Sequence, residues 1–324
     1  MQSMPLTIDP AVFAKEAIST ETQQLNAEIL ARLEALPDQW SVEPAVTREM
    51  RARGVGAFPL APKSERAETL AIDGPHGPIG LRVIRPAGAA RGVYLHIHGG
   101  GWVLGAVDQQ DPRLVRIADN CGFAVVSVDY RLAPEYPYPQ GPDDCEAAAV
   151  WLAANAQTQF GTRVLTIGGE SAGAHLSVVT LVRLRDRHGM MPFAGANLVA
   201  GVFDLGLTPS ARAWGTTRLI LSTRDVEMFV RHFLVRGGSV EDPDISPLKA
   251  RLDGLPPALF SVGTRDCLID DSMFMAARWL AAGNAAELAI YPGGAHVFQG
   301  FATALAEASL ARMDAFLNGI AAQP

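Results

Sequence analysis

Hydrophobic residues are spaced in two different ways along this chain, and each spacing predicts a different kind of element. In residues 10–36 they recur every three to four positions, at Leu25, Ile29, Leu33 and Leu36. That period places them on one side of a helix, so it predicts an amphipathic helix that packs on another part of the protein. Pro37 ends the pattern, and residues 37–66, rich in proline, glycine and arginine, are predicted to form a linker.

From residue 68 the hydrophobic positions fall in short β-branched runs separated by longer apolar segments. Residues 70–72 and 81–84 flank Gly74-Pro75-His76-Gly77-Pro78, which predicts a β-hairpin with a longer loop. Further strands are predicted at 92–97, 123–129, 163–167, 197–203, 258–263 and 287–291, and helices at 111–120, 143–154, 174–184, 272–282 and 302–320. This alternation predicts an α/β fold, with a mainly parallel sheet, helices on both faces and the hairpin at an antiparallel edge.

Residues 204–247 break the alternation. They contain prolines, a Gly-Gly pair and one predicted helix around 223–236. We interpret this segment as an insertion between two strands of the sheet that forms a helical cap with the N-terminal helices. The predicted organisation is cap helices and linker in 1–66, the first part of the α/β core in 67–203, the cap insertion in 204–247, and the second part of the core in 248–324.

The composition of the chain indicates which partners and which cellular compartment to expect. The chain has 324 residues and a net charge of −7, without a basic stripe, which argues against a nucleic-acid partner. Cys121, Cys145 and Cys267 lie far apart, which argues against a disulfide framework or a zinc site and fits a reducing compartment. The N-terminus lacks a signal-peptide pattern, and no apolar run reaches the roughly 18 residues of a membrane span. We therefore expect a cytoplasmic protein without a membrane span.

The pentapeptide Gly169-Glu170-Ser171-Ala172-Gly173 stands between a predicted strand and a predicted helix. A Gly-x-Ser-x-Gly sequence in this context is typical of a nucleophile elbow, a tight turn that exposes the serine hydroxyl. Ser171 would lie at the head of a helix, where free N–H groups and the helix dipole favour a developing negative charge. Ser171 is therefore the candidate nucleophile.

A serine nucleophile of this kind needs a base and an acid, which follow it in the order Ser, Asp or Glu, His. His296 follows the last predicted strand, and Asp266 follows strand 258–263, so both are expected at the edge of the sheet that carries Ser171. Asp270 and Asp271 directly precede a predicted helix and are interpreted as N-caps. The other histidines are disfavoured by position: His76, His96 and His98 are too early, His175 and His188 lie along the helix after Ser171, and His232 lies in the insertion.

The sequence His98-Gly99-Gly100-Gly101-Trp102 follows strand 92–97. Three glycines expose backbone N–H groups, which could stabilise the oxyanion of a tetrahedral intermediate. Glycine runs also bind phosphate, but the Gly-Lys-Ser/Thr and Gly-x-Gly-x-x-Gly patterns of such loops are absent from this chain. The N–H groups of Gly100, Gly101 and Ala172 are therefore the predicted donors. Arg131 and Glu135, past the end of strand 123–129, fit either a shell that supports these donors or an ordinary surface ion pair.

Five motifs in order, at residues 98–102, 129–135, 169–173 and 263–271 and at His296, resemble those of the bacterial hormone-sensitive-lipase-like esterases, the family IV carboxylesterases. The resemblance spans about residues 68–320 and implies an α/β-hydrolase fold, a cap, and ester hydrolysis without a cofactor or a metal; many members dimerise. It implies the triad Ser171, Asp266 and His296 and the oxyanion donors named above. The remaining motif residues are expected to support the site: His98, Gly99, Trp102, Asp129, Arg131, Glu135 and Glu170.

The chain departs from the family pattern at three positions beside catalytic groups. Glu170 replaces the usual Asp or Thr, Cys267 the usual Pro, and Val297 the common Gly. We expect Cys267 to be a buried, inert thiol, since nothing near it in the sequence indicates a lowered pKa.

Three functions are compatible with these residues. The first is hydrolysis of short- to medium-chain carboxylic esters of small molecules, because a capped pocket of limited volume excludes long chains. The second is an amidase or a deformylase-type hydrolase, since a triad does not distinguish esters from amides. The third is a non-catalytic receptor on the same scaffold, which the presence of both Ser171 and His296 disfavours.

Overall fold

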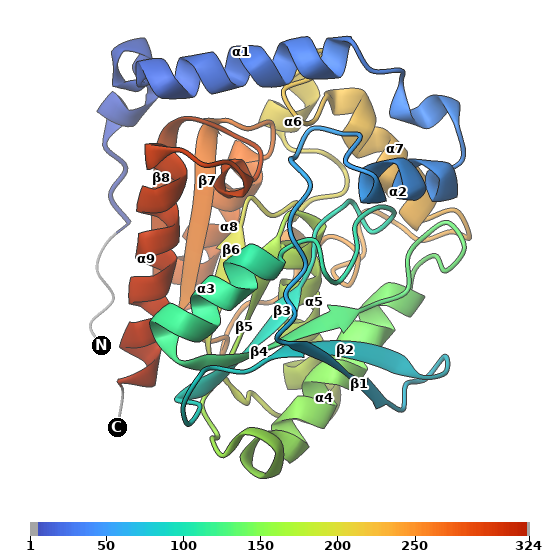
Figure 1. The fold of residues 1–324 in the computed structure, drawn as a ribbon, viewed down its shortest axis with the longest axis vertical. Helices are drawn as coiled ribbons and strands as arrows, with labels where there is room; N and C mark the ends of the chain where they lie inside the picture. The colour runs from blue at the N-terminus through green and yellow to red at the C-terminus, as the bar shows by residue number, and fades with distance from the viewer. Residues whose placement is uncertain (1–5, 323–324) are drawn as a thin grey trace.

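Eight strands form one sheet at the centre of the computed structural model, which describes residues 6–322 (Figure 1). The strands lie in the order β1-β2-β4-β3-β5-β6-β7-β8. Strand β2 is antiparallel to both of its neighbours, and all pairs from β4 to β8 are parallel. The bounds are β1 Ala67–Ile72, β2 Ile79–Ile84, β3 Gly92–Ile97, β4 Phe123–Asp129, β5 Leu165–Glu170, β6 Phe193–Val199, β7 Ala258–Arg265 and β8 Ala286–Ala295. The predicted α/β fold with a hairpin at one edge is confirmed.

Helices cover both faces of the sheet. Helices α3 (Asp111–Cys121) and α9 (Ala304–Ala321) pack on one face, and α4 (Gln140–Phe160), α5 (Ala172–His188) and α8 (Ile269–Ala281) on the other (Figure 1). Because both faces are covered, every residue of β3 and β5 is buried, including the polar residues His96, Thr166 and Glu170.

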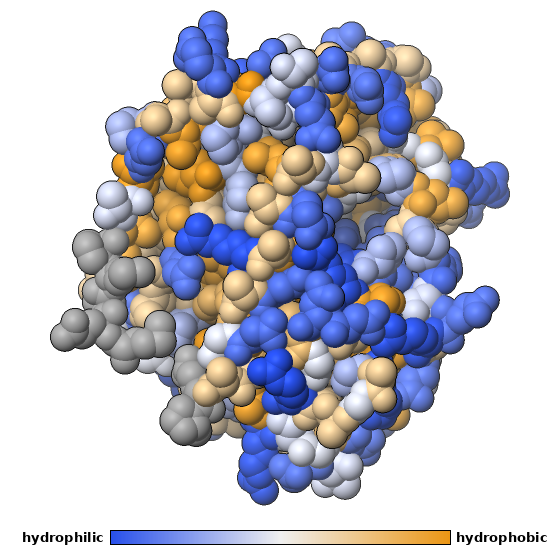
Figure 2. Space-filling view, turned by 60° about the vertical axis from the view of Figure 1, so that its left-hand side comes forward, coloured by the Kyte–Doolittle hydropathy of each residue, from blue (hydrophilic) through white to orange (hydrophobic). Residues whose placement is uncertain are grey.

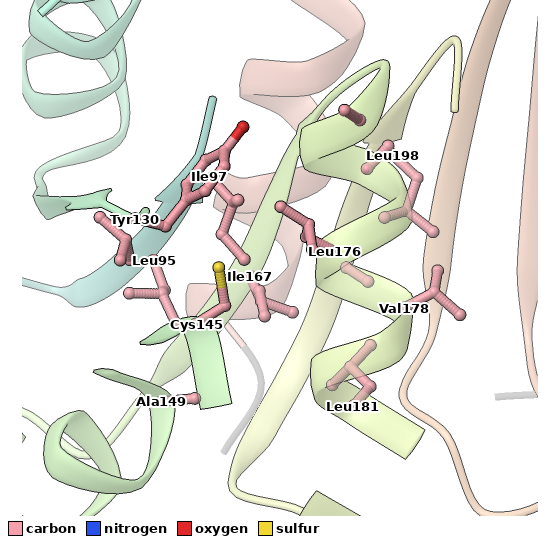
Figure 3. Close-up of a cluster of buried hydrophobic side chains, with 14 of the residues drawn as sticks. Leu95, Ile97, Tyr130, Cys145, Ala149, Ile167, Leu176, Val178, Leu181 and Leu198 are labelled. Atoms are coloured by element: carbon pink, nitrogen blue, oxygen red, sulfur yellow. The ribbon is translucent and has the colours of Figure 1, made fainter. Parts of the chain in front are cut away.

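The main hydrophobic core lies between the sheet and helices α4 and α5. Figure 3 shows Leu95, Ile97 and Ile167 of the central strands gathered with Cys145 of α4 and Leu176 of α5. Each large side chain buried in this way contributes about 1.5–3 kcal/mol to stability. This core holds the ends of β3 and β5 in place, and therefore also positions the glycine loop that follows β3 and the turn at Ser171 that follows β5.

A second group of helices lies above the carboxyl edge of the sheet, at the top of Figure 1. Its members are α1 (Thr20–Glu34), α2 (Pro44–Ala52), α6 (Pro209–Ala213) and α7 (Thr223–Phe233). The N-terminal segment contacts the 204–247 segment through Trp40, whose indole N–H donates to Asp225 at 2.7 Å and whose ring packs edge-on against Phe229 at 4.8 Å. It contacts the sheet through Asn26, which donates to the carbonyl of Gly293 at 2.8 Å.

The structure differs from the sequence predictions in the N-terminal region. Residues 10–36 are not one helix: two short 3-10 turns at Pro10–Phe13 and Lys15–Ala17 precede α1. Helix α1 begins after Ser19 because the Ser19 side chain accepts the N–H of Thr22 at 3.2 Å. Residues 37–66 are not only a linker, since they contain α2, which starts at a proline whose fixed φ suits the first helical position.

Two central strands are displaced from their predicted positions. The strand predicted at 163–167 is β5 at Leu165–Glu170, and the strand predicted at 197–203 is β6 at Phe193–Val199. Gly168 and Gly169, which disfavour strands by propensity, remain in β5 because they pair with the buried neighbours β3 and β6. Strand β5 therefore runs directly into the turn at Ser171.

None of the helices within residues 6–322 combines the length and the hydrophobicity of a membrane-spanning segment. On the face shown in Figure 2, hydrophobic residues are more frequent in the upper half, and the lower half is mainly hydrophilic.

Candidate active site

Ser171 lies in the tight turn between β5 and α5, with φ 56° and ψ −121°. A residue with a side chain in this left-handed region carries strain of about 1–3 kcal/mol, which the surrounding structure must impose. Gly169 and Gly173 show how: a Cβ atom on either would overlap the carbonyl oxygen of Ile97 at the end of β3. The Ser171 N–H also donates to the carbonyl of Val199 at 2.8 Å. The turn is therefore held between the ends of β3 and β6.

His296 and Asp266 meet at the same edge of the sheet. His296 follows β8, and its Nδ1 lies 2.9 Å from Oδ2 of Asp266, which follows β7. The other oxygen of Asp266 accepts the N–H of Leu268 at 2.9 Å, and the residue is buried, so the carboxylate is fixed in orientation. An Nδ1–H that donates to a carboxylate leaves Nε2 free to accept a proton.

Ser171 and His296 line one cavity of about 90 Å³, together with the glycine loop and apolar side chains that include Phe229 of α7. Within residues 6–322 no hydrogen bond joins the Ser171 hydroxyl to His296. In unliganded hydrolases this contact is commonly long and tightens when substrate binds.

Asp270 and Asp271 do not cap α8, which corrects the prediction from the sequence. Helix α8 begins at Ile269, so both residues lie in its first turn. Asp271 accepts the N–H of Phe203 at 2.6 Å and the hydroxyl of Thr208 at 2.7 Å, and Asp270 accepts an N–H from the same segment. Burial raises the pKa of Asp271 to about 7, although these hydrogen bonds oppose the shift. The two carboxyl groups therefore hold the start of the 204–247 segment.

The glycine loop after β3 packs directly against the turn at Ser171. A Cβ on Gly99 would lie 3.4 Å from the Cβ of Ser171. Gly100 and Gly101 have φ values of 115° and 61°, a region that favours glycine. A side chain at Gly101 would also overlap the ring of Phe229 on α7. Both positions therefore require glycine, and α7 covers the loop.

The N–H of Gly99 is already used, because it donates to Oε1 of Glu170 at 2.8 Å. This leaves the N–H groups of Gly100 and Gly101 as the loop's candidates for binding an oxyanion. Ala172 is the first residue of α5, and the first N–H groups of a helix have no partner within the helix. The three predicted donors thus come from a glycine loop and a helix start that both adjoin Ser171.

Glu170 belongs to a buried charged network behind the glycine loop. Its Oε2 lies 3.1 Å from Nε2 of His96 and accepts Nη1 of Arg113 at 3.2 Å. Burial alone would raise the pKa of Glu170, but His96, Arg113 and the N–H of Gly99 outweigh it and lower the pKa. The sequence indicated Glu170 as a supporting residue but missed Arg113 and His96. The signals that could have revealed them were a charged residue in the apolar stripe of α3, for Arg113, and a histidine inside a buried strand, for His96.

His98 and Trp102, at the two ends of the loop, are held by other aromatic residues. The Tyr130 hydroxyl donates to the carbonyl of His98 at 2.8 Å, and the two rings stack at 4.3 Å. The indole N–H of Trp102 donates to Nδ1 of His175 at 3.1 Å, so His175 carries its proton on Nε2 and donates to the carbonyl of Ile245 at 2.9 Å. Burial lowers the pKa of both histidines to about 4. His175, unsuited to be the base, instead positions Trp102.

Arg131 and Glu135 have different partners, so the surface ion pair between them does not form. Arg131 donates to Asp144 on α4 at 2.6 Å and to the carbonyl of His76 in the hairpin loop at 2.6 Å. Asp129, at the exposed end of β4, stands opposite Gly80 in the hairpin. Arg131 and Asp129 thus contact the hairpin edge of the molecule.

Glu135 is connected to the glycine loop through the side chain of Arg48. It forms an ion pair with Arg48 of α2, and Arg48 donates to the carbonyl of Val103 at 2.8 Å. The carbonyl of Val103 belongs to the turn that closes the glycine loop. Glu135 therefore links the N-terminal helices to this loop.

Two of the positions that depart from the family pattern have structural consequences. Cys267 is buried, and burial raises the pKa of its thiol well above the ordinary value, which fits the expected inert cysteine. Val297 has φ 51° and ψ 41°, a left-handed conformation in which a β-branched residue is strained and glycine is not. Its side chain is buried and lines the cavity beside His296.

Comparisons with known proteins identify the family and the fold of this chain. A family model described as the alpha/beta hydrolase fold matches residues 94–300. The carboxylic ester hydrolase LipN of Mycobacterium tuberculosis is 37% identical over 229 residues, which make up 68% of this chain and 60% of that protein. Esterase LipI of the same organism is 32% identical over 292 residues, 87% of this chain and 90% of that protein. An esterase of the bacterial hormone-sensitive lipase family has a crystal structure with a TM-score of 0.80 and 29% identity, covering 94% of this chain and 99% of that one.

The chain belongs to the α/β-hydrolase family. Within that class it is one of the bacterial hormone-sensitive-lipase-like carboxylic ester hydrolases, as the resemblance of its motifs implied.

Proposed function

We propose that this chain hydrolyses short- to medium-chain carboxylic esters through an acyl-enzyme on Ser171. The observation that carries the proposal is the hydrogen bond between His296 and Asp266 beside the cavity that Ser171 lines. The strained turn at Ser171 and the adjacent glycine loop add a nucleophile and donors to this base and acid.

In the first half-reaction, Oγ of Ser171 attacks the ester carbonyl carbon while Nε2 of His296 takes the hydroxyl proton. The N–H groups of Gly100, Gly101 and Ala172 bind the resulting oxyanion, and the Asp266 carboxylate stabilises the imidazolium. The C–O bond to the alcohol then breaks, and His296 gives its proton to the leaving oxygen.

In the second half-reaction, water attacks the acyl-enzyme with His296 again as base, which releases the acid and restores the serine. Glu170 keeps the glycine loop in place through Gly99, and His98 and Trp102 support its two ends. These residues act by positioning the donors and do not touch the reacting atoms.

The preference for short to medium chains rests on the small cavity at Ser171. Its volume is about 90 Å³, and apolar side chains bound it: Phe58, Ile220, Leu221, Phe229 and Val297. The preference for esters over amides rests on the names of the relatives, which are esterases and carboxylic ester hydrolases.

The helices above the sheet act as a cap in this proposal, with residues 1–66 and 204–247 as its two parts and 67–203 and 248–324 as the core; residues 1–5 and 323–324 of these ranges lie outside the described part of the chain. The contacts of Trp40 with Asp225 and Phe229 support the assignment of both segments to one unit. A homodimer, which the resemblance to the family suggested, and a cytoplasmic location, which the sequence predicted, belong to the proposal as well. The absence of a basic stripe supports a protein that acts on small molecules rather than nucleic acid.

The test is the hydrolysis of 4-nitrophenyl butyrate by the wild type, by Ser171→Ala and by Ser239→Ala, an exposed serine that serves as the control. We expect Ser239→Ala to retain wild-type kcat/KM. We expect Ser171→Ala to retain only the roughly 10³–10⁴-fold acceleration over water that binding and an oxyanion hole provide without a nucleophile. Butyryl 4-nitroanilide, assayed in parallel, tests the amidase alternative. Turnover by Ser171→Ala at the wild-type rate, or a higher kcat/KM for the anilide than for the ester, contradicts the proposal.

A further inference from the structure

A larger cavity of about 970 Å³ adjoins the one at Ser171. It lies between the extended segment 55–63 and helix α3. The two cavities share part of their lining: Arg51, Ala57, Phe58, Gln109 and Gln110. The far end of a substrate bound at Ser171 can therefore reach these residues, where the two cavities meet.

Four basic side chains line the larger cavity, and three of them are neutralised by carboxylates. These pairs are Lys63 with Asp108 at 2.5 Å, Arg113 with Glu170 at 3.2 Å, and Arg116 with Asp314 at 2.9 Å. The fourth is Arg51, which lines both cavities. Among the described residues Arg51 has no carboxylate within ion-pair distance, and its one side-chain hydrogen bond runs from Nη2 to Oε1 of Gln39 at 2.9 Å.

Asp225, which attracts Arg51, and Asp119, which lines the larger cavity, both have other partners. Asp225 attracts the guanidinium from behind Gln39, but it accepts hydrogen bonds from Gln39 and from the indole of Trp40. Asp119, on the wall of the larger cavity, pairs with Arg66 at 2.8 Å. The remaining guanidinium N–H groups of Arg51 thus have no partner among the described residues, and the side chain borders both cavities.

Arg51 remains a cation at neutral pH. Burial lowers its pKa to about 10, and Asp225 opposes the shift. Two carboxamides accompany it where the cavities join: within the described residues, the side chains of Gln109 and Gln110 make no hydrogen bond. Beside Ala57 and Phe58, the junction therefore offers one positive charge without a paired carboxylate and several free donors, which suits an anionic group with planar oxygens.

We infer that the esters cleaved at Ser171 carry a carboxylate at an end remote from the scissile bond, and that Arg51 binds this carboxylate. The inference rests on the proposed function, because it names the substrate class of that site. The carboxylate belongs to the acyl part or to the alcohol part of the ester, and the two arms of the test distinguish these sources.

The test compares substrates that differ only in a terminal carboxylate. The acyl arm uses 4-nitrophenyl hexanoate and mono-4-nitrophenyl adipate; the alcohol arm uses 4-methylphenyl acetate and 4-acetoxybenzoate. The readout is the anionic preference, defined as kcat/KM for the anionic ester divided by kcat/KM for its neutral partner. A buried charge-assisted hydrogen bond changes such a ratio by about tenfold to a hundredfold, so Arg51→Gln should lower the anionic preference by that factor in one arm.

Arg53→Gln is the matched control, because Arg53 lies at the end of the same helix with an exposed side chain 3.9 Å from Glu49. It removes the same charge and should leave the anionic preference unchanged. If Arg51→Gln leaves the preference unchanged in both arms, or if Arg53→Gln lowers it equally, the inference is wrong.

Two further measurements apply if Arg51→Gln fails to fold. Arg51→Lys keeps the charge but loses the planar fork, so it should lower the preference less than tenfold. In the wild type the anionic preference should exceed one in the arm whose carboxylate Arg51 binds; a preference of one or less in both arms overturns the inference. The neutral esters distinguish failure of this inference from failure of the proposed function. If the wild type hydrolyses them and Ser171→Ala does not, the proposed function stands and only the binding of a carboxylate by Arg51 is disproved.

Discussion

Replacement of Glu170 by glutamine tests whether the buried network behind the glycine loop fixes the oxyanion donors. The carboxylate of Glu170 accepts the N–H of Gly99 at 2.8 Å on one side and contacts Arg113 at 3.2 Å and His96 at 3.1 Å on the other. Glutamine keeps one acceptor for Gly99, but its amide nitrogen cannot accept from Arg113. The guanidinium then remains buried without a carboxylate.

The cost to stability follows from this loss. Removal of one partner from a buried ion pair costs about 3–5 kcal/mol, because the other charge stays uncompensated. We expect a loss of this size in the free energy of unfolding of Glu170→Gln at pH 7. The pKa of Glu170 is lowered in the folded state, so its contribution is present above its unfolded pKa of roughly 4.3 and is lost as the pH falls through the lower folded pKa. The difference between wild type and variant should therefore shrink below about pH 4.

The two substitutions of Glu170, by glutamine and by alanine, should lower kcat by different factors. Loss of one oxyanion donor lowers kcat by about 10²–10³. Glu170→Ala also removes the acceptor for Gly99, so its kcat should fall by that factor, whereas Glu170→Gln should lose about tenfold. The assays are urea unfolding at pH 7 and at about pH 3, and kcat for 4-nitrophenyl butyrate. Glu68→Gln is the control, since it removes an exposed carboxylate that pairs with Arg85 at 2.8 Å. Glu170 variants with wild-type stability and kcat would refute the reasoning.

Three other substitutions give separate expectations. Asp266→Asn should keep the fold and lower kcat by about 10⁴, because the imidazole of His296 loses its orienting carboxylate; near-normal kcat would contradict this role. The pKa of Asp271 is raised to about 7 by burial, so its contribution to stability is complete below its unfolded pKa and is lost as the pH rises through about 7. Asp271→Asn resembles the protonated acid, so it should remove the pH dependence that Asp271 gives to the free energy of unfolding. The measurement is urea unfolding between pH 5 and pH 9, and a pH profile like that of the wild type would contradict the expectation. Phe229→Ala opens the cavity beside Gly101 and should shift kcat/KM toward longer acyl chains; an unchanged chain-length profile would show that Phe229 does not limit the cavity.

The sequence predicted the elements whose own residues determine them. Strands β3 and β4 begin and end where predicted because each is a mainly apolar run, with His96 in β3 and Ser127 and Asp129 in β4 as the polar exceptions. The turn at Ser171 was predictable because the glycines that allow the close approach of β3 belong to a short, recognisable Gly-x-Ser-x-Gly sequence. In contrast, β5 extends through Gly168 and Gly169 only because neighbouring strands pair with them, which no local pattern records.

The supporting network of the site was less predictable, because its contacts join residues far apart in the chain. Arg113 meets Glu170 across 57 positions, and Arg48 meets Glu135 across 87. Helix α2 was missed because it lacks the apolar stripe that predicts a helix from sequence. In the structure only Pro44 and Thr47 among its residues are buried. The order of the motifs along the chain indicated a nucleophile, an acid and a base, whereas the partners that fix them emerge only when the chain is folded.

The central claim, that Ser171 is the nucleophile, is tested most directly by mass spectrometry of the protein after treatment with a serine-directed organophosphate. The account predicts a single adduct, located on the peptide that contains Ser171, with loss of esterase activity in proportion to its formation. Ser171→Ala should gain no mass under the same conditions, while Ser239→Ala should react like the wild type. An adduct on another residue, or complete inactivation with Ser171 unmodified, would contradict the account.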